Sequence, residues 1–166
     1  YQAFMQRIYD LWIQDGRTIR IREFENALSL LSIRRSGYTD PLPHKGSIAF
    51  ALVSIARDGS ITTFSPELAS GTSSNPHYFA IGNVTEIKSL DECLENANFQ
   101  QQLKEVGLGI QYCAESCEYF DFCGGGCPSN KFYERGTFAT TDTIYCNLSI
   151  KTMMDLMINN LSSAKR

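Results

Sequence analysis

The sequence predicts an α+β fold from three patterns. A β-hairpin is expected where Asp58-Gly59 separates the β-rich runs of residues 47–64, because Asp-Gly favours tight hairpin turns. A C-terminal helix is expected from near Asn147, where apolar residues recur on one face. The first part of the chain alternates a helical pattern (1–14), a short β-like run (18–21) and a second helical pattern (23–33), which is typical of an α/β unit.

Composition excludes several classes of function. The chain has 166 residues and a net charge of −3, so it is about one domain long. It has no broad basic surface for nucleic acid. No run of about eighteen apolar residues suggests a membrane span, and the first residues do not form a signal peptide. We therefore expect a cytoplasmic protein with neither a nucleic-acid nor a membrane partner.

Residues 34–46 contain two prolines and two glycines and show no periodicity, which is typical of a boundary. The predicted organisation is an α/β fragment over 1–36, a linker over 37–46 and a second domain over 47–166. In that domain, 79–84 is expected to be extended and 89–107 helical, and the region around the cysteines mostly loop. Because the chain opens inside a predicted helix without a Met, we expect it to be part of a longer protein.

Five of the six cysteines follow a C-x3-C-x5-C-x3-C spacing, and eighteen residues then precede the last Cys. They are Cys113, Cys117, Cys123, Cys127 and Cys146. Gly124–Gly126 fill the gap between Cys123 and Cys127, and glycine allows backbone to wrap closely around sulfur ligands. This clustering favours metal ligation over disulfides. Spacing alone suits an iron–sulfur cluster and a zinc site equally well.

Several residues near the motif have ordinary structural interpretations. Cys93 lies in a helical pattern beside Leu94 and is expected to be a small core residue. His44 and His77 are expected to be solvated loop residues rather than ligands. Lys131 is expected either to anchor the cysteine loop or to lie on the surface. The methionine stripe of the C-terminal helix is expected to be core.

The full run CEYFDFCGGGCPSNKFYERGTF, followed by Tyr145-Cys146, resembles the SPASM domain of radical SAM enzymes. The likeness is strongest to the maturases of glycine-rich-repeat peptides (GRRM type). LWIQDGRTIRIREFENALSLL, DGSITTFSPEL and FAIGNV also resemble segments of that family, so the likeness covers nearly the whole chain. The interval Cys113-x3-Cys117 is one residue longer than the family's first interval.

The resemblance implies a SPASM-like domain whose loops wrap an auxiliary [4Fe–4S] cluster held by Cys113, Cys117, Cys123 and Cys146. Cys127 would belong to a second auxiliary cluster. The upstream stretch that normally supplies its other ligands corresponds to residues 62–84 and contains no Cys. Cys127 is therefore left as a free thiol, an alternative ligand of the first cluster, or a contact to a group outside this chain.

By the same resemblance, residues 1–36 are the end of a partial (β/α) barrel whose N-terminal part is a missing partner. The chain has no C-x3-C-x2-C motif, so we do not expect it to cleave S-adenosylmethionine alone. Arg20, Arg22 and Glu23 would face S-adenosylmethionine or substrate, or they are ordinary surface charges.

The complete enzyme would install a C–C crosslink, a cyclophane, in a ribosomally made precursor peptide. Two other interpretations stay open, a zinc-stabilised structural module and a stand-alone peptide-binding module whose hairpin adds a strand to a bound peptide.

Overall fold

The computed structural model describes residues 1–40, 42–70 and 78–163. His77 lies outside these ranges. The chain forms two compact units, Tyr1–Asp40 with Ile144–Arg166 (unit 1) and Pro41–Thr143 (unit 2). The units group segments by their contacts, so the functional domains predicted above stay predictions. No helix in the described ranges is long and apolar enough to cross a bilayer.

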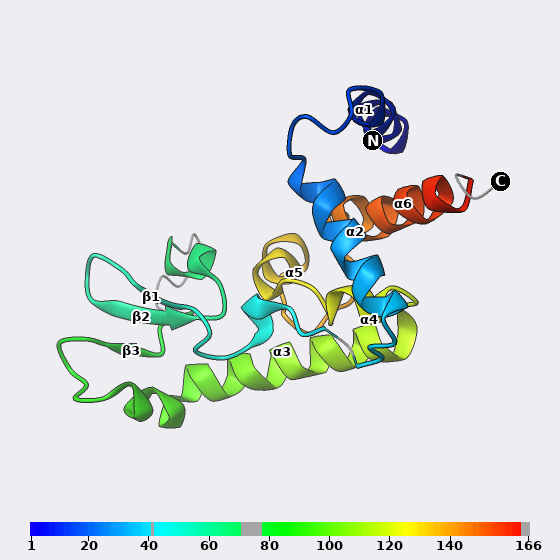
Figure 1. The fold of residues 1–166 in the computed structure, drawn as a ribbon. Helices are drawn as coiled ribbons and strands as arrows, with labels where there is room; N and C mark the ends of the chain where they lie inside the picture. The colour runs from blue at the N-terminus through cyan, green and yellow to red at the C-terminus, as the bar shows by residue number, and fades with distance from the viewer. Residues whose placement is uncertain (41, 71–77, 164–166) are drawn as a thin grey trace. The chain divides into compact units, whose positions relative to one another are not determined.

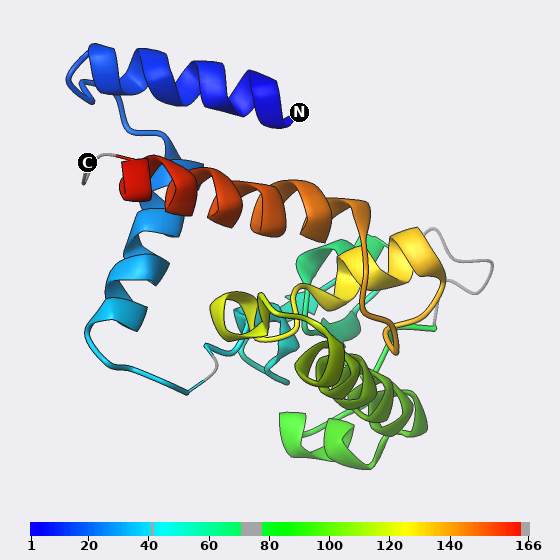
Figure 2. The same cartoon turned by 90° about the vertical axis from the view of Figure 1, so that its right-hand side faces the viewer.

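Unit 1 is helical. It contains α1 (Gln2–Gln14), α2 (Arg22–Arg35), a π-helical segment η4 (Cys146–Lys151) and α6 (Thr152–Ser163). Helix α6 contacts both α1 and α2, and Figure 2 shows it beside them. The predicted methionine core is confirmed, because Met153, Met154 and Met157 are all buried.

Aromatic rings join the first two helices of unit 1. Phe24 of α2 is fully buried and lies 5.4 Å from Tyr9 and 5.2 Å from Trp12, between ring centroids. Such pairs add about 0.5–1.5 kcal/mol beyond the area that they bury. Between α1 and α6, Gln6 and Asn160 exchange side-chain amide hydrogen bonds of 3.1 and 2.9 Å.

The strand predicted at 18–21 is wrong, because these residues form no strand in the described chain. A strand needs a neighbour to accept its backbone hydrogen bonds, and the described part of unit 1 offers no second strand. The carbonyl of Ile19 instead accepts a 2.7 Å hydrogen bond from the indole Nε1 of Trp12.

Unit 2 contains the sheet and the long helix α3 (Figure 1). The predicted hairpin is confirmed: β1 (Val53–Ile55) pairs antiparallel with β2 (Ser60–Thr63), with Ile55 opposite Ile61. Strand β3 (Gly82–Asn83) adds antiparallel to β2 and gives the order β1-β2-β3. Short 3₁₀ segments lie at η1 (Lys45–Ser47), η2 (Pro66–Ser70) and η3 (Leu90–Glu95).

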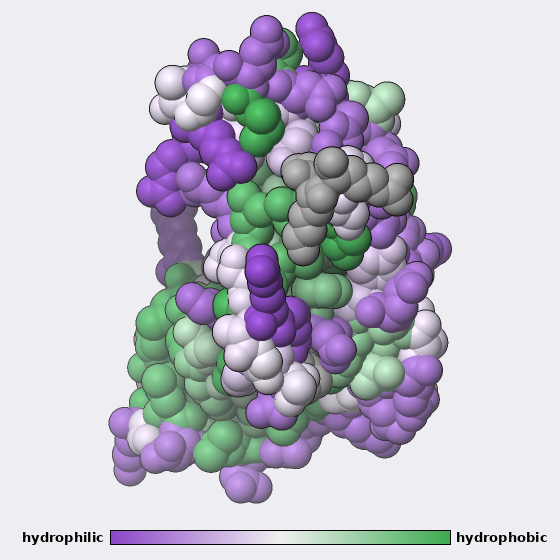
Figure 3. Space-filling model, turned by 45° about the vertical axis from the view of Figure 1, so that its right-hand side comes forward, coloured by the Kyte–Doolittle hydropathy of each residue, from purple (hydrophilic) through white to green (hydrophobic). Residues whose placement is uncertain are grey.

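The core of unit 2 joins the sheet to α3 (Ala97–Ser116). It contains Ile61, Phe64, Leu68, Phe79, Ile81, Cys93, Phe99, Val106 and Phe138. Cys93 is 1% exposed, which confirms its predicted role as a core residue. Large apolar side chains are nevertheless exposed in both units, and green areas of Figure 3 show such residues on one face.

The prediction that the cysteine region is mostly loop is wrong. It contains the end of α3, α4 (Phe120–Cys123) and α5 (Pro128–Arg135). Cys113 continues the buried face of α3 at helical spacing after Val106 and Gly109. Pro128 occupies the first turn of α5 and Gly136 ends it with φ +75°, the usual proline start and glycine stop.

The C-terminal helix starts earlier than predicted. Helical residues begin at Ile144, and Asn147 lies inside η4 rather than at an N-cap. A π-helical turn places one extra residue in the turn, and such turns are frequent at functional sites. Cys146 is the first residue of this segment.

Candidate metal centre

Four of the five predicted ligands lie in unit 2, at the ends of three helices. Cys113 is in the last turns of α3, and Cys117 is its C-cap residue. Cys123 ends α4, and Cys127 is the residue directly before α5. Cysteines at helix ends can turn toward a common point while the helices hold their backbones rigid.

Cys113, Cys117 and Cys123 share one electrostatic environment. Burial raises the pKa of the Cys123 thiol most strongly, and the nearby charges of Cys117 and Cys113 raise it further. The backbone N–H of Gly125 and the charge of Lys131 act in the opposite direction. The charges of Cys113 and Cys117 therefore act on the same thiol, that of Cys123.

The connection from Cys123 to Cys127 has a backbone that only glycine adopts without strain. Gly124, Gly125 and Gly126 have φ values of +58°, +95° and +73°. A Cβ on Gly124 would lie 2.1 Å from the carbonyl oxygen of Leu42. The three glycines therefore let the chain reverse against its neighbours and direct the Gly125 amide at Cys123.

Cys127 has a different environment. Its Sγ lies 3.1 Å from Ser129 Oγ and 3.9 Å from Ser65 Oγ. Ser65 also hydrogen bonds to Ser129 at 3.1 Å and to the carboxylate of Glu67. In the described chain, Cys127 therefore contacts hydroxyl groups, and its ligand role stays a prediction.

Lys131, which the sequence left as either an anchor or a surface residue, is buried with 4% exposure. Its Nζ donates to the Gly109 carbonyl oxygen at 2.8 Å and to Cys113 Sγ at 3.4 Å. Sequence reasoning could have found this residue from the pattern of α5, where Lys131 follows buried Pro128 by three positions on one face.

Cys146 belongs to unit 1 and is half-buried at the start of η4. Its assignment as a cluster ligand therefore rests on the sequence motif. Within the described ranges, no three His, Cys, Asp or Glu side chains group tightly enough to hold a single metal ion. A four-iron cluster asks for a different arrangement, because each iron takes its own cysteine.

The donor chemistry of unit 2 fits an iron–sulfur cluster. It offers three thiols in one environment, an amide that stabilises a thiolate, and a buried cation against the anionic charge of a thiolate-ligated cluster.

His44, expected to be a solvated loop residue, is half-buried. Its Nδ1 accepts a 3.1 Å hydrogen bond from the Gly46 amide and caps η1. Desolvation by burial lowers the pKa of His44, so a neutral imidazole is the favoured form near neutral pH.

The residues predicted to face S-adenosylmethionine form exposed ion pairs in unit 1. Arg20 pairs with Glu25 at 2.8 Å, and Arg22 pairs with Glu23 at 2.8 Å. These contacts raise the pKa of each arginine and lower that of each glutamate. Exposed pairs contribute little to stability, and the predicted role of these residues remains a prediction.

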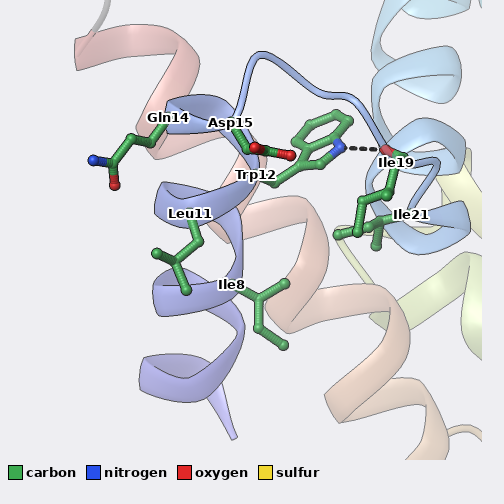
Figure 4. A pocket seen from close by; sticks show the side chains of 7 residues that line it. All are labelled: Ile8, Leu11, Trp12, Gln14, Asp15, Ile19 and Ile21. Carbon is green, nitrogen blue, oxygen red and sulfur yellow. Dashed lines mark hydrogen bonds between the residues drawn. The ribbon is translucent and has the colours of Figure 1, made fainter.

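Unit 1 also contains a cavity of about 590 Å³, and none of these four charged residues lines it. Figure 4 shows its lining, which is Ile8, Leu11, Trp12, Gln14, Asp15, Ile19 and Ile21. The lining is mostly apolar and offers one carboxylate.

Comparison with known proteins gives two relatives. The chain is 33% identical over 166 residues to the uncharacterized protein sll1766 of Synechocystis sp. (strain ATCC 27184 / PCC 6803 / Kazusa), covering 99% of this chain and 40% of that protein. It is 27% identical over 173 residues to a cysteine-type anaerobic sulfatase-maturating enzyme of Clostridium novyi (strain NT), covering 98% of this chain and 40% of the enzyme. The chain thus spans about two fifths of the length of these relatives.

The likeness to a maturating enzyme supports a relationship to radical SAM maturases, the class suggested by the cysteine motif. It does not single out the glycine-rich-repeat type. No family model matches the sequence, and no solved structure matches it significantly.

Proposed function

We propose that this chain is the C-terminal auxiliary-cluster part of a radical SAM peptide maturase. The observation that carries the proposal is the shared environment of Cys113, Cys117 and Cys123 beside the Gly125 amide. In this proposal the three thiolates hold a [4Fe–4S] cluster, and the sequence motif supplies Cys146 as the fourth ligand. Cys127 is a weaker candidate, because hydroxyl groups are its recorded partners.

When bound, such a cluster supplies a one-electron acceptor for the electron that remains after ring closure. The protein's own residues do the rest of the work at this centre. The helix ends of α3 and α4 fix the thiols, and the glycine connection brings backbone close to them. Burial of Cys113 keeps water from its sulfur.

For the complete protein we propose formation of a C–C crosslink, a cyclophane, in a precursor peptide. The new bond replaces two C–H bonds of the peptide. S-adenosylmethionine, cleaved at a site that the proposed N-terminal barrel provides, takes one hydrogen atom. The second hydrogen leaves as a proton and an electron. Arg20, Arg22 and Glu23 are proposed to face that site, and support for this part comes from the sequence resemblance alone.

A second candidate follows from the name of the Clostridium novyi relative, a cysteine-type anaerobic sulfatase-maturating enzyme. The complete protein would then modify a cysteine of a sulfatase. Mass spectrometry of a reacted peptide separates the two candidates. A crosslink lowers the peptide mass by two hydrogens and leaves every side-chain sulfur in place, whereas the second candidate changes the mass of a cysteine residue.

The auxiliary-cluster proposal is tested by anaerobic iron and sulfide analysis of this chain, with an absorption spectrum before and after reduction. We expect about four irons and four sulfides per chain and a brown colour that bleaches on reduction. Replacing Cys113, Cys117, Cys123 or Cys146 by Ala should remove most of the iron.

Cys93→Ala is the matched control, because Cys93 is a core residue of the same unit and its loss should leave iron content unchanged. One zinc without sulfide would replace the proposal with a structural zinc module. About eight irons would instead show a second cluster and give Cys127 a ligand role.

A further inference from the structure

We infer that Lys131 is a built-in cation that raises the reduction potential of the cluster held at Cys113. The inference rests on the proposed function and adds a positioning residue that the cysteine motif does not contain. Its basis is the contact of the buried ammonium with Cys113 Sγ.

The lysine is held in place from both ends. Its backbone lies in α5, and its Nζ donates a 2.8 Å hydrogen bond to the carbonyl oxygen of Gly109 in α3. Gly109 leaves the required space, since a Cβ there would lie 3.1 Å from the Lys131 Nζ and 2.2 Å from the Phe138 carbonyl oxygen. A side chain at this position would therefore collide with the Phe138 backbone and crowd the Lys131 ammonium.

The charge of this lysine lacks the usual compensation. Buried ammonium groups are normally paired with an anion. In the part of the chain that the structure describes, no carboxylate forms an ion pair with Lys131, and its recorded partners are one carbonyl oxygen and one thiol. A thiolate, or a cluster ligated by thiolates, supplies the missing negative charge.

The charge acts on more than one thiol. Lys131 contacts Cys113 directly and also opposes the effect of burial on Cys123. A cluster bound there gains negative charge when it accepts an electron, so a fixed cation favours the reduced form and raises the potential. A lysine that only joined the two helices would not alter the potential.

The test is a redox titration of the iron-loaded chain, followed by absorption or electron paramagnetic resonance. The reductant, dithionite, gives up one electron for each cluster reduced, and no bond of the protein changes. Lys131→Met removes both the charge and the donor, whereas Lys131→Gln keeps a neutral donor. Lys104→Met is the matched control, because Lys104 is an exposed lysine of α3 in the same unit.

In both neutral variants we expect the ratio of reduced to oxidised cluster at a fixed potential to fall at least tenfold, equivalent to about 59 mV for one electron. The Lys104 control should match the unchanged chain. An unchanged potential in fully loaded Lys131→Met and Lys131→Gln would overturn the inference. A fall in Lys131→Met alone would also overturn it, because the donor would then matter rather than the charge.

If neither neutral variant loads iron, Lys131→Arg decides. A Lys131→Arg chain that loads iron and keeps the potential of the unchanged chain supports the inference, whereas a changed potential or a failure to load overturns it. The proposed function fails separately, when the unchanged chain itself contains no iron and sulfide.

Discussion

Two buried side chains of unit 2 have opposite chemical characters. Cys93 is 1% exposed among apolar residues, whereas Lys131 is 4% exposed with its ammonium against a carbonyl and a thiol. Burial alone stabilises the first, because a neutral thiol behaves as a small hydrophobe. The second is retained at a cost in desolvation, which is why a function for its charge is worth testing.

Replacing Cys93 by Ser should destabilise unit 2 by about 1–3 kcal/mol, because a hydroxyl would be buried without a partner. Cys93→Ala should cost less than Cys93→Ser, although it removes more atoms. Urea unfolding of the two variants, monitored by circular dichroism, measures the difference. The opposite order would show that the Cys93 site can satisfy a hydroxyl.

The environment of His44 should make the folding stability of the chain depend on pH. The pKa of this histidine is lowered in the folded chain, so the unfolded chain binds a proton more readily. The stability that this histidine contributes should be present above the unfolded pKa of about 6.5 and be lost as pH falls below it.

The measurement is the free energy of unfolding at about pH 7.5 and 5.5, compared between the unchanged chain and His44→Asn. The unchanged chain should lose more stability on acidification than the variant, since Asn cannot take up a proton. Equal losses would mean that another group dominates this range of pH.

At the scale of elements, the cysteine motif is built from helix ends joined by three glycines with positive φ. The sequence identified the hairpin, because Asp58-Gly59 acts through local turn geometry. It misjudged 18–21, because a strand depends on a partner elsewhere in the chain. It also missed the helices near Cys113, although Cys113 continues the buried face of α3.

Only those parts of the candidate site that have a local sequence pattern could be predicted. Spacing and glycines marked Cys113–Cys127, but the contact between Lys131 and Cys113 joins α5 to α3. Such a tertiary contact has no pattern in one sequence. The same limit applies to Cys146, whose ligand role still rests on the motif.

Alanine substitutions at two of the three glycines between Cys123 and Cys127 should lower the stability of the chain by different amounts. Gly124→Ala should destabilise the metal-free chain more than Gly126→Ala. Both substitutions place a side chain at positive φ, which costs about 1–2 kcal/mol. Only at Gly124 would the new Cβ also collide with backbone, at Leu42, whereas Gly126 has open space around it.

Urea unfolding of the two variants measures this difference, and iron content after reconstitution shows whether the centre survives. Equal destabilisation would mean that the Leu42 segment moves aside without cost.

At the scale of the whole molecule, the two compact units do not simply follow one another along the chain. Unit 2 is one continuous segment, whereas unit 1 is assembled from both ends of the chain. Among the described residues, every member of the apolar core from Ile61 to Phe138 belongs to unit 2. This arrangement is typical of a segment that can fold by itself.

We therefore expect a shortened chain of residues 41–143 to unfold cooperatively. Its urea transition, followed by circular dichroism, should be a single sigmoidal curve with a slope appropriate to its size. A broad, non-cooperative transition would show that unit 2 depends on the terminal segments for its order.

The sequence contains one tryptophan, and this residue, Trp12, lies in unit 1 with its indole 5% exposed and bonded to Ile19. The aromatic residues of unit 2 are phenylalanines and tyrosines. Indole emission therefore reports on one unit alone, while the phenylalanine bands in the near-ultraviolet are weighted toward the other, which holds eight of the ten phenylalanines. The two halves of this molecule carry different optical labels, so the order in which they melt can be recorded from the unaltered protein.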